Sequence, residues 1–458
     1  MLNPKNYLIH FTGIGGIGMS AIAEILIAQG YAVSGSDIRE TPLTQRLNRA
    51  GARIYYQHVP ENIKNAGVVV YSTAIQSDNC ELKAAKEKQI PIIHRSEMLS
   101  EIVRRRFSIA VTGAHGKTTT TGIIGEILHH ANMNPTIVLG GIMNALSTNA
   151  QSGSGDYIVV EADESDASLL NLYPSIAIIT NIDQEHMDHY GSMEKVQDAF
   201  LTFANRPPFY GACILCVDDP VLRSFVPRIN CNCLTYGIKQ PALFMASNIE
   251  ETGPFETSFD CVYKTKTIER FTLPMTGHHN VSNALAAIAA CKMLDIPWHI
   301  QKNAFSKIAG VQRRMEIRGE TGHVLVMDDY GHHPTEIIAT LKAIKTGWPD
   351  YRLCVLFQPH RYSRTKDLFD RFTSAFKQAD QLIVLPVYSA GETPIEGVNS
   401  QDLSLSIKKY QQGSIFYAET FAEAIGLIDT TKKTLLLTLG AGDIRNAGDL
   451  FLSKSGQC

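Results

Sequence analysis

Hydrophobic residues along the chain recur in one repeated order: a short apolar run, then glycine or acidic residues, then apolar residues at helical spacing. The first example begins with a strand predicted over residues 7–12. It passes through the glycines of "TGIGGIG" and a helical pattern to a second strand in "YAVSGSD". Parallel strands need crossover connections, which helices supply. The pattern therefore predicts an α/β fold with largely parallel sheets.

The same order starts twice more along the chain. It restarts at "RFSIAVTGAHGKTTTTGIIGEILHHAN", which leads to strands predicted over 157–163 and 175–183. It restarts again at "HVLVMDDY", with helices predicted from Pro334 and Thr365 and a late strand in "TLLLTLGAGD". The stretch 231–275 alternates polar and apolar residues, which predicts an antiparallel patch on the middle part of the chain.

The length of 458 residues is too great for one ordinary core, so we expect three α/β domains. Boundaries near Arg106 and Arg318 give an N-terminal domain at 1–106, a central domain at 107–317 and a C-terminal domain at 318–458. Domains of this size leave clefts between them for ligands.

The composition is that of an ordinary globular protein, with 44% hydrophobic and 19% charged residues. No run approaches the roughly 18 apolar residues of a membrane span, and the N-terminus lacks a signal-peptide pattern. We therefore expect a cytoplasmic protein with no membrane partner. The net charge of −3 argues against a nucleic-acid partner. The spacing of Cys213 with Cys216, and of Cys231 with Cys233, does not match a zinc knuckle, so free thiols are expected.

Glycines follow the first predicted strand at the spacing G-x-G-x-x-G, formed by Gly13, Gly15 and Gly18, with Gly16 in the same turn. Asp37 ends the next strand. In a Rossmann-type turn the backbone N–H groups hold a pyrophosphate and the acid reaches a ribose. NAD, FAD or a nucleotide sugar would each satisfy the motif. The structural alternative is that the glycines only make a tight turn.

The stretch "VTGAHGKTTTTG" resembles a phosphate-binding loop that lacks its first glycine, because Val111 stands five residues before Gly116. Gly113, Gly116, Lys117 and Thr118 still lie between a strand and a helix. Backbone N–H groups of a shorter loop can wrap phosphates while the lysine neutralises their charge and the threonine hydroxyl binds a metal ion. We therefore predict a nucleotide site here.

Acidic residues end the next predicted strand, in "VVEADESD". Glu161 and Asp163 are two residues apart and so lie on one side of an extended chain. Ligands gather at the carboxyl edge of a parallel sheet, and Mg²⁺ prefers carboxylate oxygen. One carboxylate is expected to bind the metal with Thr118, and the role of a second is open.

The motif "TNIDQEHMDHYG" brings His186 and His189 to the spacing i, i+3. Imidazole suits zinc or manganese better than magnesium, and helix capping or surface hydrogen bonding is the alternative. In "TGHHNVSNALAAIAA", Asn280 could read adenine or cap a helix. The last third of the chain places many arginines and histidines at strand ends, where a purely structural protein would not need them. They occur in "QRRMEIRG", "DDYGHHPTE" and "QPHRYSRT".

Taken together, these motifs resemble the Mur ligases, in the same order and over nearly the whole chain. The pair "GAHGKTTTT" and "QPHRYSRT" is far more specific than a lone glycine loop, and the short G-x-x-G-K-T loop is the family's own form. The resemblance implies a Rossmann-like N-terminal domain for the UDP of a sugar substrate and a central P-loop ATPase-like domain for ATP. It also implies a Rossmann-like C-terminal domain that brings the amino acid.

Within the family, the motifs are most similar to the branch that joins L-alanine to UDP-N-acetylmuramate through an acyl phosphate, a step of peptidoglycan synthesis. The resemblance implies ATP and Mg²⁺ as cofactors, with Mn²⁺ possible. Implied UDP-sugar contacts are Gly13, Gly15, Gly16, Gly18 and Asp37. Implied ATP contacts are Gly113, Ala114, His115, Gly116, Lys117, Thr118, Thr119, Asn280 and Asp329. Implied metal ligands are Thr118, Glu161 and His186. The implied catalytic residues are Lys117, Glu161, His186, Arg313 and Arg314, with one of the two arginines at the γ-phosphate. The implied amino-acid pocket is Tyr330, His332, Arg361 and Arg364.

The chain departs from several family members at one point. Those members support a second metal with a carbamylated lysine, whereas the corresponding region here reads "FANRPPFYG", with Asn205 and Arg206 and no lysine. This departure fits the alanine-adding branch and leaves the second-metal ligands open.

Three other functions compete with this interpretation. A family relative that joins a ready-made tripeptide to the same sugar nucleotide shares almost all the motifs. A dinucleotide-dependent oxidoreductase would explain the first glycine turn but leaves Lys117, Glu161 and the late arginines without a role. A non-catalytic ATP-binding regulator would not need two phosphate turns in separate domains.

Overall fold

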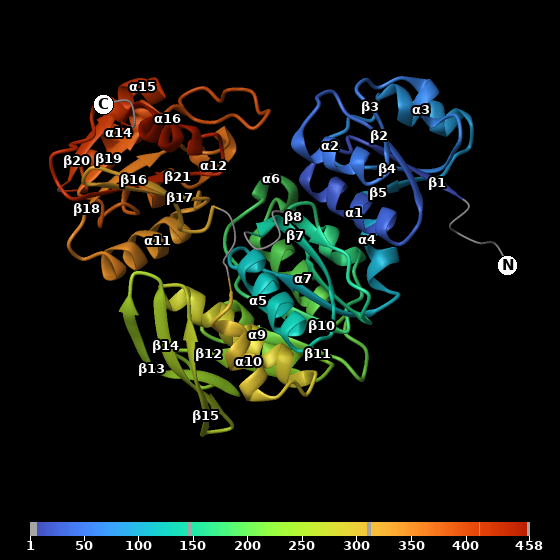
Figure 1. Cartoon of the computed structure of the whole chain (residues 1–458), viewed down its shortest axis with the longest axis horizontal. Helices are drawn as coiled ribbons and strands as arrows, with labels where there is room; N and C mark the ends of the chain where they lie inside the picture. The colour runs from blue at the N-terminus through green and yellow to red at the C-terminus, as the bar shows by residue number, and fades with distance from the viewer. Residues whose placement is uncertain (1–6, 144–147, 309–312, 412, 456–458) are drawn as a thin grey trace. The chain divides into compact units, whose positions relative to one another are not determined.

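The computed structural model describes residues 7–143, 148–308, 313–411 and 413–455. The described residues form three sheets (Figure 1) within two compact units. The first unit comprises Met1–Ser247, Asp260–Phe271 and Ser282–Ala309, and the second comprises Asn248–Phe259, Thr272–Val281 and Gly310–Cys458. The expected α/β architecture with largely parallel sheets is confirmed, while the boundaries near Arg106 and Arg318 stay predictions.

The N-terminal sheet has the order β3-β2-β1-β4-β5, and all its strands are parallel. Its strands are β1 (Leu8–Thr12), β2 (Ala32–Ser36), β3 (Arg53–Tyr55), β4 (Ala66–Tyr71) and β5 (Ile92–His94). Its helices are α1 (Ile17–Ala28), α2 (Pro42–Arg49), η2 (Pro60–Ile63), α3 (Cys80–Glu87) and α4 (Arg95–Val103). Strand β1 is central and meets α1 at the glycine turn, as the sequence pattern predicts.

A buried polar network lies beneath that turn. The fully buried carboxylate of Glu81 accepts hydrogen bonds from Thr12 Oγ1 at 2.9 Å, Ser36 Oγ at 2.7 Å and Asn62 Nδ2 at 2.7 Å. His10 Nε2 lies 3.3 Å from the same carboxylate. Burial alone would raise the pKa of Glu81, but these partners outweigh it and lower the pKa to about 2. Thr12 and Ser36 end β1 and β2, so the network ties the two strands together where the glycine turn begins.

The central sheet has the order β15-β14-β13-β12-β11-β10-β6-β9-β7-β8. Its strands are β6 (Phe107–Thr112), β7 (Thr136–Met143), β8 (Thr148–Gln151), β9 (Tyr157–Glu161), β10 (Ile176–Ile179), β11 (Ala212–Cys216), β12 (Cys233–Gly237), β13 (Phe244–Gly253), β14 (Glu256–Tyr263) and β15 (Lys266–Leu273). Its helices are α5 (Lys117–His130), η3 (Ser168–Asn171), α6 (Met187–Tyr190), α7 (Met193–Ala204), α8 (Pro220–Phe225), η4 (Val226–Arg228), α9 (His278–Met293) and α10 (Trp298–Phe305). Strands β6, β9, β10 and β11 are parallel and buried, which explains their continuous apolar runs.

Three expectations for this region need correction. The strand predicted over 175–183 is β10, which ends at Ile179. Strand β9 ends at Glu161 and not at residue 163, so Asp163 lies in the loop that follows. The predicted antiparallel patch at 231–275 is only partly right, because β12 pairs in parallel with both β11 and β13. The later strands are joined by two-residue connections, too short for a parallel crossover. One of these turns, Lys264–Thr265, has positive φ at both residues, as tight hairpin turns require.

The C-terminal sheet has the order β16-β17-β21-β18-β19-β20, with only β16 antiparallel among the pairs of described strands. Its strands are β16 (Glu316–Thr321), β17 (Val324–Asp329), β18 (Arg352–Phe357), β19 (Gln381–Val384), β20 (Ser414–Tyr417) and β21 (Thr434–Leu439). Its helices are α11 (Pro334–Gly347), α12 (Tyr362–Asp367), α13 (Phe369–Thr373), α14 (Ser400–Lys408), α15 (Phe421–Gly426) and α16 (Arg445–Ser455). The helix expected from Thr365 begins earlier, at Tyr362.

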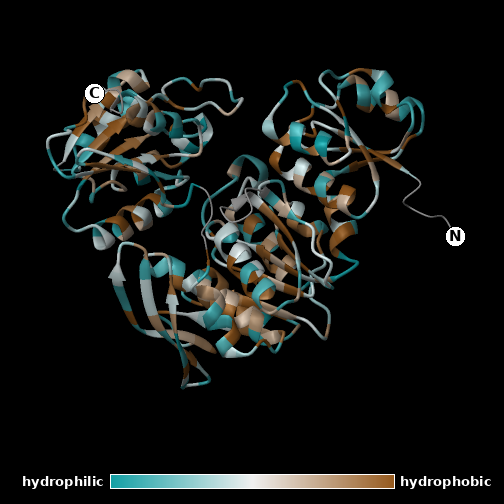
Figure 2. Ribbon diagram, in the orientation of Figure 1, coloured by the Kyte–Doolittle hydropathy of each residue, from teal (hydrophilic) through white to brown (hydrophobic). Residues whose placement is uncertain are grey.

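Two hydrophobic cores cover the two faces of the C-terminal sheet. Alternate residues of each strand point to opposite faces, so Met327 of β17 and Leu437 of β21 belong to one core, whereas Val326 and Leu436 belong to the other. Figure 2 shows the central strands of the sheets as largely hydrophobic ribbons. This burial on both faces fixes the carboxyl ends of the strands, where the candidate site residues lie.

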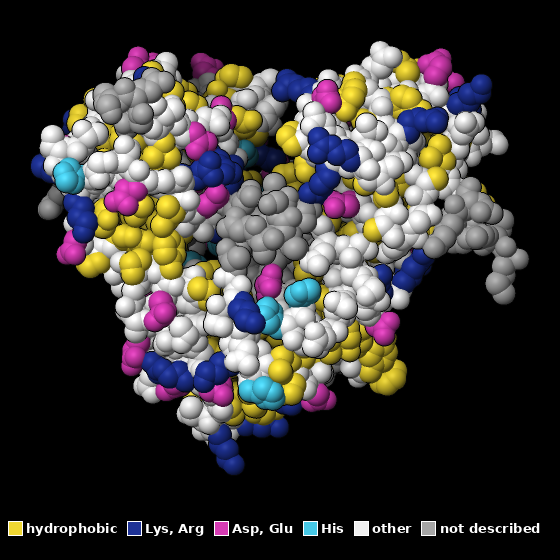
Figure 3. Space-filling model, in the orientation of Figure 1, with side chains coloured by type: hydrophobic (Ala, Val, Ile, Leu, Met, Phe, Trp, Pro, Cys, Tyr) yellow, Lys and Arg dark blue, Asp and Glu magenta, His cyan; other side chains and the backbone are white. Residues whose placement is uncertain are grey.

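The surface carries mixed charge. On the face drawn in Figure 3, lysine and arginine side chains are interspersed with aspartate and glutamate. Among the described residues, no helix combines the length and apolar character needed to cross a bilayer. The eight cysteines in the described part of the chain are free thiols, as expected for this spacing.

Candidate active site

The N-terminal glycine turn joins β1 to α1. Gly13 has a φ of 79°, and its N–H donates to Ser36 O at 2.8 Å. Gly16 is the N-cap of α1, and no side chain of the described residues caps that helix end. The first N–H groups of α1 are therefore oriented as an anion-binding site requires.

Asp37 lies on this turn. Its carboxylate accepts hydrogen bonds from the N–H of Gly15 at 2.8 Å and from the N–H of Ile38 at 2.8 Å. A Cβ on Gly15 would lie 2.7 Å from an oxygen of the same carboxylate, so a larger residue there would displace the Asp37 side chain. Asp37 thus fixes the turn itself, and its role toward a ribose stays a prediction.

The backbone of the phosphate loop between β6 and α5 shows why the loop needs only two glycines. Gly113 has a φ of 135°, and a Cβ there would lie 2.1 Å from Thr180 Oγ1. Gly116 has a φ of 84°, and a Cβ there would lie 2.4 Å from Asn283 Oδ1. Val111, where a longer loop would have its first glycine, is a buried residue of β6. The two glycines that remain are the two that the backbone needs.

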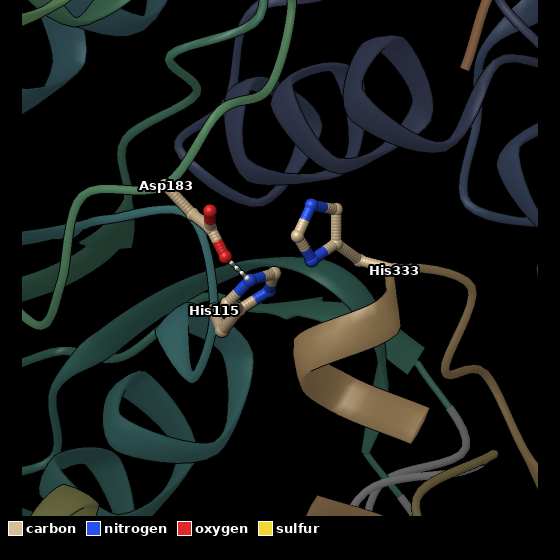
Figure 4. A group of neighbouring side chains, drawn as sticks. All are labelled: His115, Asp183 and His333. Atoms are coloured by element: carbon tan, nitrogen blue, oxygen red, sulfur yellow. Dashed lines mark hydrogen bonds and ion pairs between the residues drawn. The ribbon is translucent and has the colours of Figure 1, made fainter. Parts of the chain in front are cut away.

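Residues after β10 hold the phosphate loop in place. The N–H of His115 donates to Asn181 Oδ1 at 2.8 Å, while His115 O accepts from Asn181 Nδ2 and from Thr180 Oγ1. The imidazole Nε2 of His115 lies 3.3 Å from the carboxylate of Asp183, the contact dashed in Figure 4. The predicted loop residues Ala114 and His115 are therefore fixed by the "TNID" segment. Thr119 follows in the first turn of α5.

Lys117 is bound inside the loop. Its ammonium donates to Gly113 O at 2.5 Å, to Ala114 O at 3.1 Å and to Glu164 Oε1 at 2.7 Å. Burial would lower the pKa of Lys117, but Glu164 and Glu161 outweigh it and the pKa is raised. The lysine is therefore a permanent cation at the position where phosphates would lie.

Thr118 and Glu161 meet at the predicted metal position. Thr118 Oγ1 donates to Glu161 Oε2 at 2.8 Å, and the N–H of Gly140 donates to the same oxygen at 2.8 Å. Burial raises the pKa of Glu161. A hydroxyl and a carboxylate thus converge from α5 and β9, which matches the oxygen ligands that Mg²⁺ prefers.

His186 lies in the segment that follows β10, and its contacts are with Glu164 and Glu185. It is the N-cap of α6 with a φ of 56°, and its Nε2 lies 3.7 Å from Glu164 Oε1 and 3.5 Å from Glu185 Oε2. Burial would lower the pKa of His186, but these carboxylates raise it to about 9. Glu164, Glu185 and His186 form one of the groups of side chains close enough to hold a metal ion. His189, by contrast, is exposed and its ring contacts Tyr190.

Asp163 is held elsewhere. Its Oδ2 lies 2.6 Å from Arg95 Nη2, and Arg95 also lies 3.8 Å from Asp166. Arg95 begins α4 of the N-terminal sheet, and a Cβ on Gly18 would lie 3.2 Å from its Nη1. The loop carboxylate of Asp163 therefore pairs with an arginine beside the glycine turn.

The region that lacks a lysine has structural contacts instead. Asn205 Nδ2 donates to Leu201 O and Arg228 O, and Asn205 Oδ1 accepts from the N–H of Asn230. Arg206 lies over the ring of Tyr173, 4.2 Å from its centroid.

In the second unit, Arg313 and Arg314 differ sharply. The guanidinium of Arg313 donates to Asp328 Oδ2 at 3.1 Å and to Gly440 O at 2.7 Å. Arg314 is more exposed, and its Nη1 lies 3.6 Å from Glu336 Oε1. Arg313 binds groups at the ends of β17 and β21, so Arg314 is the better of the two candidates for a phosphate contact.

Asp329 and Asn280 are both buried. Asp329 accepts hydrogen bonds from the N–H groups of Met315 and Gly331, and burial raises its pKa to about 6. Asn280 Nδ2 donates to Thr276 O at 2.8 Å, near the start of α9. Their predicted contacts with ATP stay predictions.

The predicted amino-acid residues gather at the ends of β17 and β18. The ring of His332 lies 5.3 Å from that of Tyr330 and 5.9 Å from that of His360. Arg364 Nη1 donates to His360 O at 3.3 Å, and Arg361 is the N-cap of α12. Burial and the surrounding cationic groups lower the pKa of His360 to about 3. The cluster is rich in positive charge, which suits a carboxylate ligand.

Sequence reasoning left several residues of these clusters unassigned. Glu164 stands in the quoted motif "EADESD", but only the fold brings it to Lys117, 47 positions away. Asn283 stands in the quoted motif "TGHHNVSNALAAIAA", three residues after Asn280, whereas Arg95 carries no local signal. Glu185 and His360 stand beside assigned residues, and their polar character next to a strand end is the signal that could have found them.

Three family models match successive parts of the chain. "Mur ligase family, catalytic domain" matches residues 8–107, "Mur ligase middle domain" matches 111–291, and "Mur ligase, glutamate ligase domain" matches 313–442.

Curated relatives match over nearly the full length. The UDP-N-acetylmuramate–L-alanine ligase of Desulfatibacillum aliphaticivorans is 47% identical over 98% of this chain and 99% of its own. The enzyme of the same name from Desulfosudis oleivorans is 48% identical over 98% of each chain.

Solved structures agree with this similarity. The UDP-N-acetylmuramate-alanine ligase of Thermotoga maritima matches with a TM-score of 0.83 and 29% identity, covering 98% of this chain and 99% of its own. A murein peptide ligase from Psychrobacter arcticus shares the fold, with a TM-score of 0.72 and 24% identity over 99% of each chain.

Proposed function

The chain belongs to the Mur ligase family, and from this premise we propose that it joins L-alanine to UDP-N-acetylmuramate with conversion of ATP to ADP and phosphate. The observation that carries the proposal is a set of contacts beyond the carboxyl ends of the neighbouring strands β10, β6 and β9: Thr118 binds Glu161, and Glu164 contacts both Lys117 and His186. Relatives that share almost half of all residues over the full chain supply the choice of substrates.

The reaction needs an activated carboxyl group, because a carboxylate is a poor acyl donor. The muramyl carboxylate attacks the γ-phosphorus of ATP, ADP leaves, and an acyl phosphate forms. The amine of L-alanine then attacks the acyl carbon, loses a proton and expels inorganic phosphate. Catalysis of such transfers is mainly positioning and charge neutralisation.

The chain's own residues divide this work. Lys117 lies in the phosphate loop and neutralises phosphate oxygens, while the backbone N–H groups around Gly113 and Gly116 bind them. Arg314 faces the γ-phosphate when the substrates are bound. Tyr330, His332, Arg361 and Arg364 receive the carboxylate of L-alanine, and the glycine turn with Asp37 receives the UDP.

The metal requirement fits the residues present. Thr118 Oγ1 and Glu161 Oε2 already converge. His186 lies close to Glu164 and Glu185, whose carboxylates can supply the oxygen ligands that a carbamylated lysine supplies in other family members. Thr118, Glu161 and His186 would hold Mg²⁺, or Mn²⁺, which suits imidazole better. When bound, the metal neutralises charge on the transferred phosphate.

One assay tests the proposal: release of phosphate from ATP in the presence of Mg²⁺ and UDP-N-acetylmuramate, with L-alanine, glycine, L-serine or the stem tripeptide as the amine. We expect L-alanine to give the highest kcat/KM. Preference for the tripeptide would assign the recycling activity instead, and full turnover without the sugar nucleotide would reject both.

The acyl phosphate has its own test. Hydroxylamine in place of L-alanine should yield a sugar hydroxamate, because an acyl phosphate is electrophilic. Unmodified sugar under conditions where L-alanine supports turnover would require a different activation route.

A further inference from the structure

A loop of the second unit contacts the segment that carries both arginines of the predicted amino-acid pocket. It connects β19 to α14 over residues 385–399 and is called the clamp loop here. Its residue Tyr388 pairs with His360 as a parallel β-bridge: Tyr388 N–H donates to Pro359 O, and Tyr388 O accepts from the N–H of Arg361, both at 2.8 Å. The rings of Tyr388 and His360 are stacked with centroids 5.5 Å apart.

A carboxylate of the same loop binds the next turn of chain. Glu392 accepts a hydrogen bond from the N–H of Ser363 at 3.0 Å through Oε2, and from the hydroxyl of Ser363 at 2.6 Å through Oε1. Ser363 lies between Arg361 and Arg364. The clamp loop therefore holds the short segment 361–364 at two residues, Arg361 and Ser363.

This segment needs holding because its backbone is strained. Arg361 has φ 71° and ψ 138°, a combination that residues other than glycine seldom adopt. Such a conformation persists only where the surroundings fix it. Here they do so through Tyr388 O at the N–H of Arg361, and through Thr365, whose hydroxyl donates to Arg361 O at 2.8 Å. Glu392 adds the third constraint, two residues further along at Ser363.

We propose that Glu392 is a positioning residue that fixes Arg361 and Arg364 in the orientation that binds the carboxylate of the amino-acid substrate. This inference rests on the proposed function of that pocket. A pocket whose two cations are already ordered loses less conformational entropy when the carboxylate arrives. Glu392 therefore sets the affinity for the amine substrate without touching it.

The clamp loop offers a matched control. Glu396 lies four residues further along the same loop and is exposed, so its charge can be removed without loss of a contact to 361–364. Glu392→Ala, Glu392→Gln and Glu396→Gln are compared with wild type for KM and kcat with each of the three substrates.

Glu392→Ala should raise KM for L-alanine by about tenfold to a hundredfold, because hydrogen bonds to a charged group that order the pocket are lost. KM for ATP and for the sugar nucleotide should stay within about twofold, and kcat at saturating L-alanine should be largely kept. The KM of Glu392→Gln for L-alanine should lie between those of wild type and Glu392→Ala, since the amide oxygen can still accept one hydrogen bond. Glu396→Gln should match wild type, and hydroxamate formation with hydroxylamine should be unchanged in every variant.

Two results would overturn the inference: an equal loss for all three substrates, or an unchanged KM for L-alanine in Glu392→Ala. A crystal structure of Glu392→Ala gives an independent readout, since the segment 361–364 should have higher B-factors than in wild type. If wild type prefers an amine other than L-alanine, the substrate assignment fails, and the effect of Glu392 is then measured with the amine that wild type uses.

Discussion

Arg95 and Asp163 form an ion pair with 2.6 Å between guanidinium Nη2 and carboxylate Oδ2. Burial would raise the pKa of Asp163, but Arg95 and hydrogen bonds from Ser165 lower it to about 2, so the carboxylate is charged at any working pH. Arg95 lies beside the glycine turn, and Asp163 lies on the loop that follows Glu161 and also carries Glu164. The pair thus links the proposed sugar-nucleotide site to the proposed phosphate site.

Removing this link should uncouple the two sites. We expect Arg95→Ala to raise KM for UDP-N-acetylmuramate and to lower kcat, each by about tenfold, because a charge-assisted hydrogen bond that orders both loops is lost. Steady-state kinetics with each substrate varied in turn measures both effects. Arg104→Ala is the control, since Arg104 ends the same helix and its partner Glu101 forms an exposed pair of little energetic weight. An effect on KM for L-alanine alone would contradict the prediction.

Because Lys117 and Glu164 form a buried ion pair, substitutions of the two residues should affect stability and turnover differently. Lys117→Ala should abolish turnover because a cation of the phosphate loop is lost, and it should lower the thermal midpoint because Glu164 keeps an uncompensated buried charge. Adding Glu164→Gln to Lys117→Ala should restore the midpoint to within a few degrees of wild type, with no recovery of activity. Calorimetry and phosphate release on the two variants measure this. Recovery of activity in the double variant would rule out a catalytic role for Lys117.

Two carboxylates of "EADESD" should respond differently to magnesium. Glu161→Gln should raise the Mg²⁺ concentration that gives half-maximal rate by at least about tenfold, since a charged oxygen ligand becomes a neutral one. Asp163→Asn should leave that concentration unchanged, because Asp163 is bound to Arg95. Titration of the rate with Mg²⁺, after removal of bound metal with a chelator, compares the two. Equal shifts would mean that both carboxylates bind the metal.

The Glu81 network predicts a specific acid sensitivity. The folded-state pKa of Glu81 is about 2 against an ordinary 4.5, so its stabilisation is complete above pH 4.5 and is lost as the pH falls toward 2. A difference of that size corresponds to about 3 kcal/mol. The thermal midpoint of wild type should therefore fall more steeply between pH 5 and pH 3 than that of Glu81→Gln. If the thermal midpoints of the two proteins fell equally with pH, the pKa of Glu81 would not be lowered in the folded state.

The spacing of residues within short motifs was enough to predict the glycine turn and the phosphate loop, because each is formed by one continuous stretch of backbone. The glycine turn and the phosphate loop lie between strand and helix because Gly13, Gly113 and Gly116 adopt positive φ that other residues avoid. Lys117 and Thr118 follow at fixed distance, so their position was readable from the sequence alone. The parallel sheets followed from the same alternation of strands and helices.

Contacts between distant parts of the chain were not readable in this way. Glu164 reaches Lys117 only because β9 pairs beside β6, and Glu392 reaches Ser363 across 29 residues. In an extended strand, residues two apart point to the same side, so we expected Asp163 beside Glu161. Strand β9 ends at Glu161, so the alternation does not extend to Asp163. Similarly, alternation in residues 231–275 indicated strands but not the parallel direction of β12, which depends on its neighbour β11.

The spacing of Arg361 and Arg364 carries the last prediction. The segment is helical from Tyr362, with Arg361 as its N-cap, so both guanidinium groups start from one turn of chain. A carboxylate in a closing cleft needs such partners, and removing one should raise KM for L-alanine by about tenfold to a hundredfold, with little change for ATP or the sugar nucleotide. Arg364→Lys should recover only part of the loss, because an ammonium lacks the planar fork of guanidinium. Initial rates at varied L-alanine measure this, with Arg371→Ala as the control, since Arg371 belongs to α13 and donates to Thr335. A loss of equal size for ATP would instead assign these arginines to the phosphates.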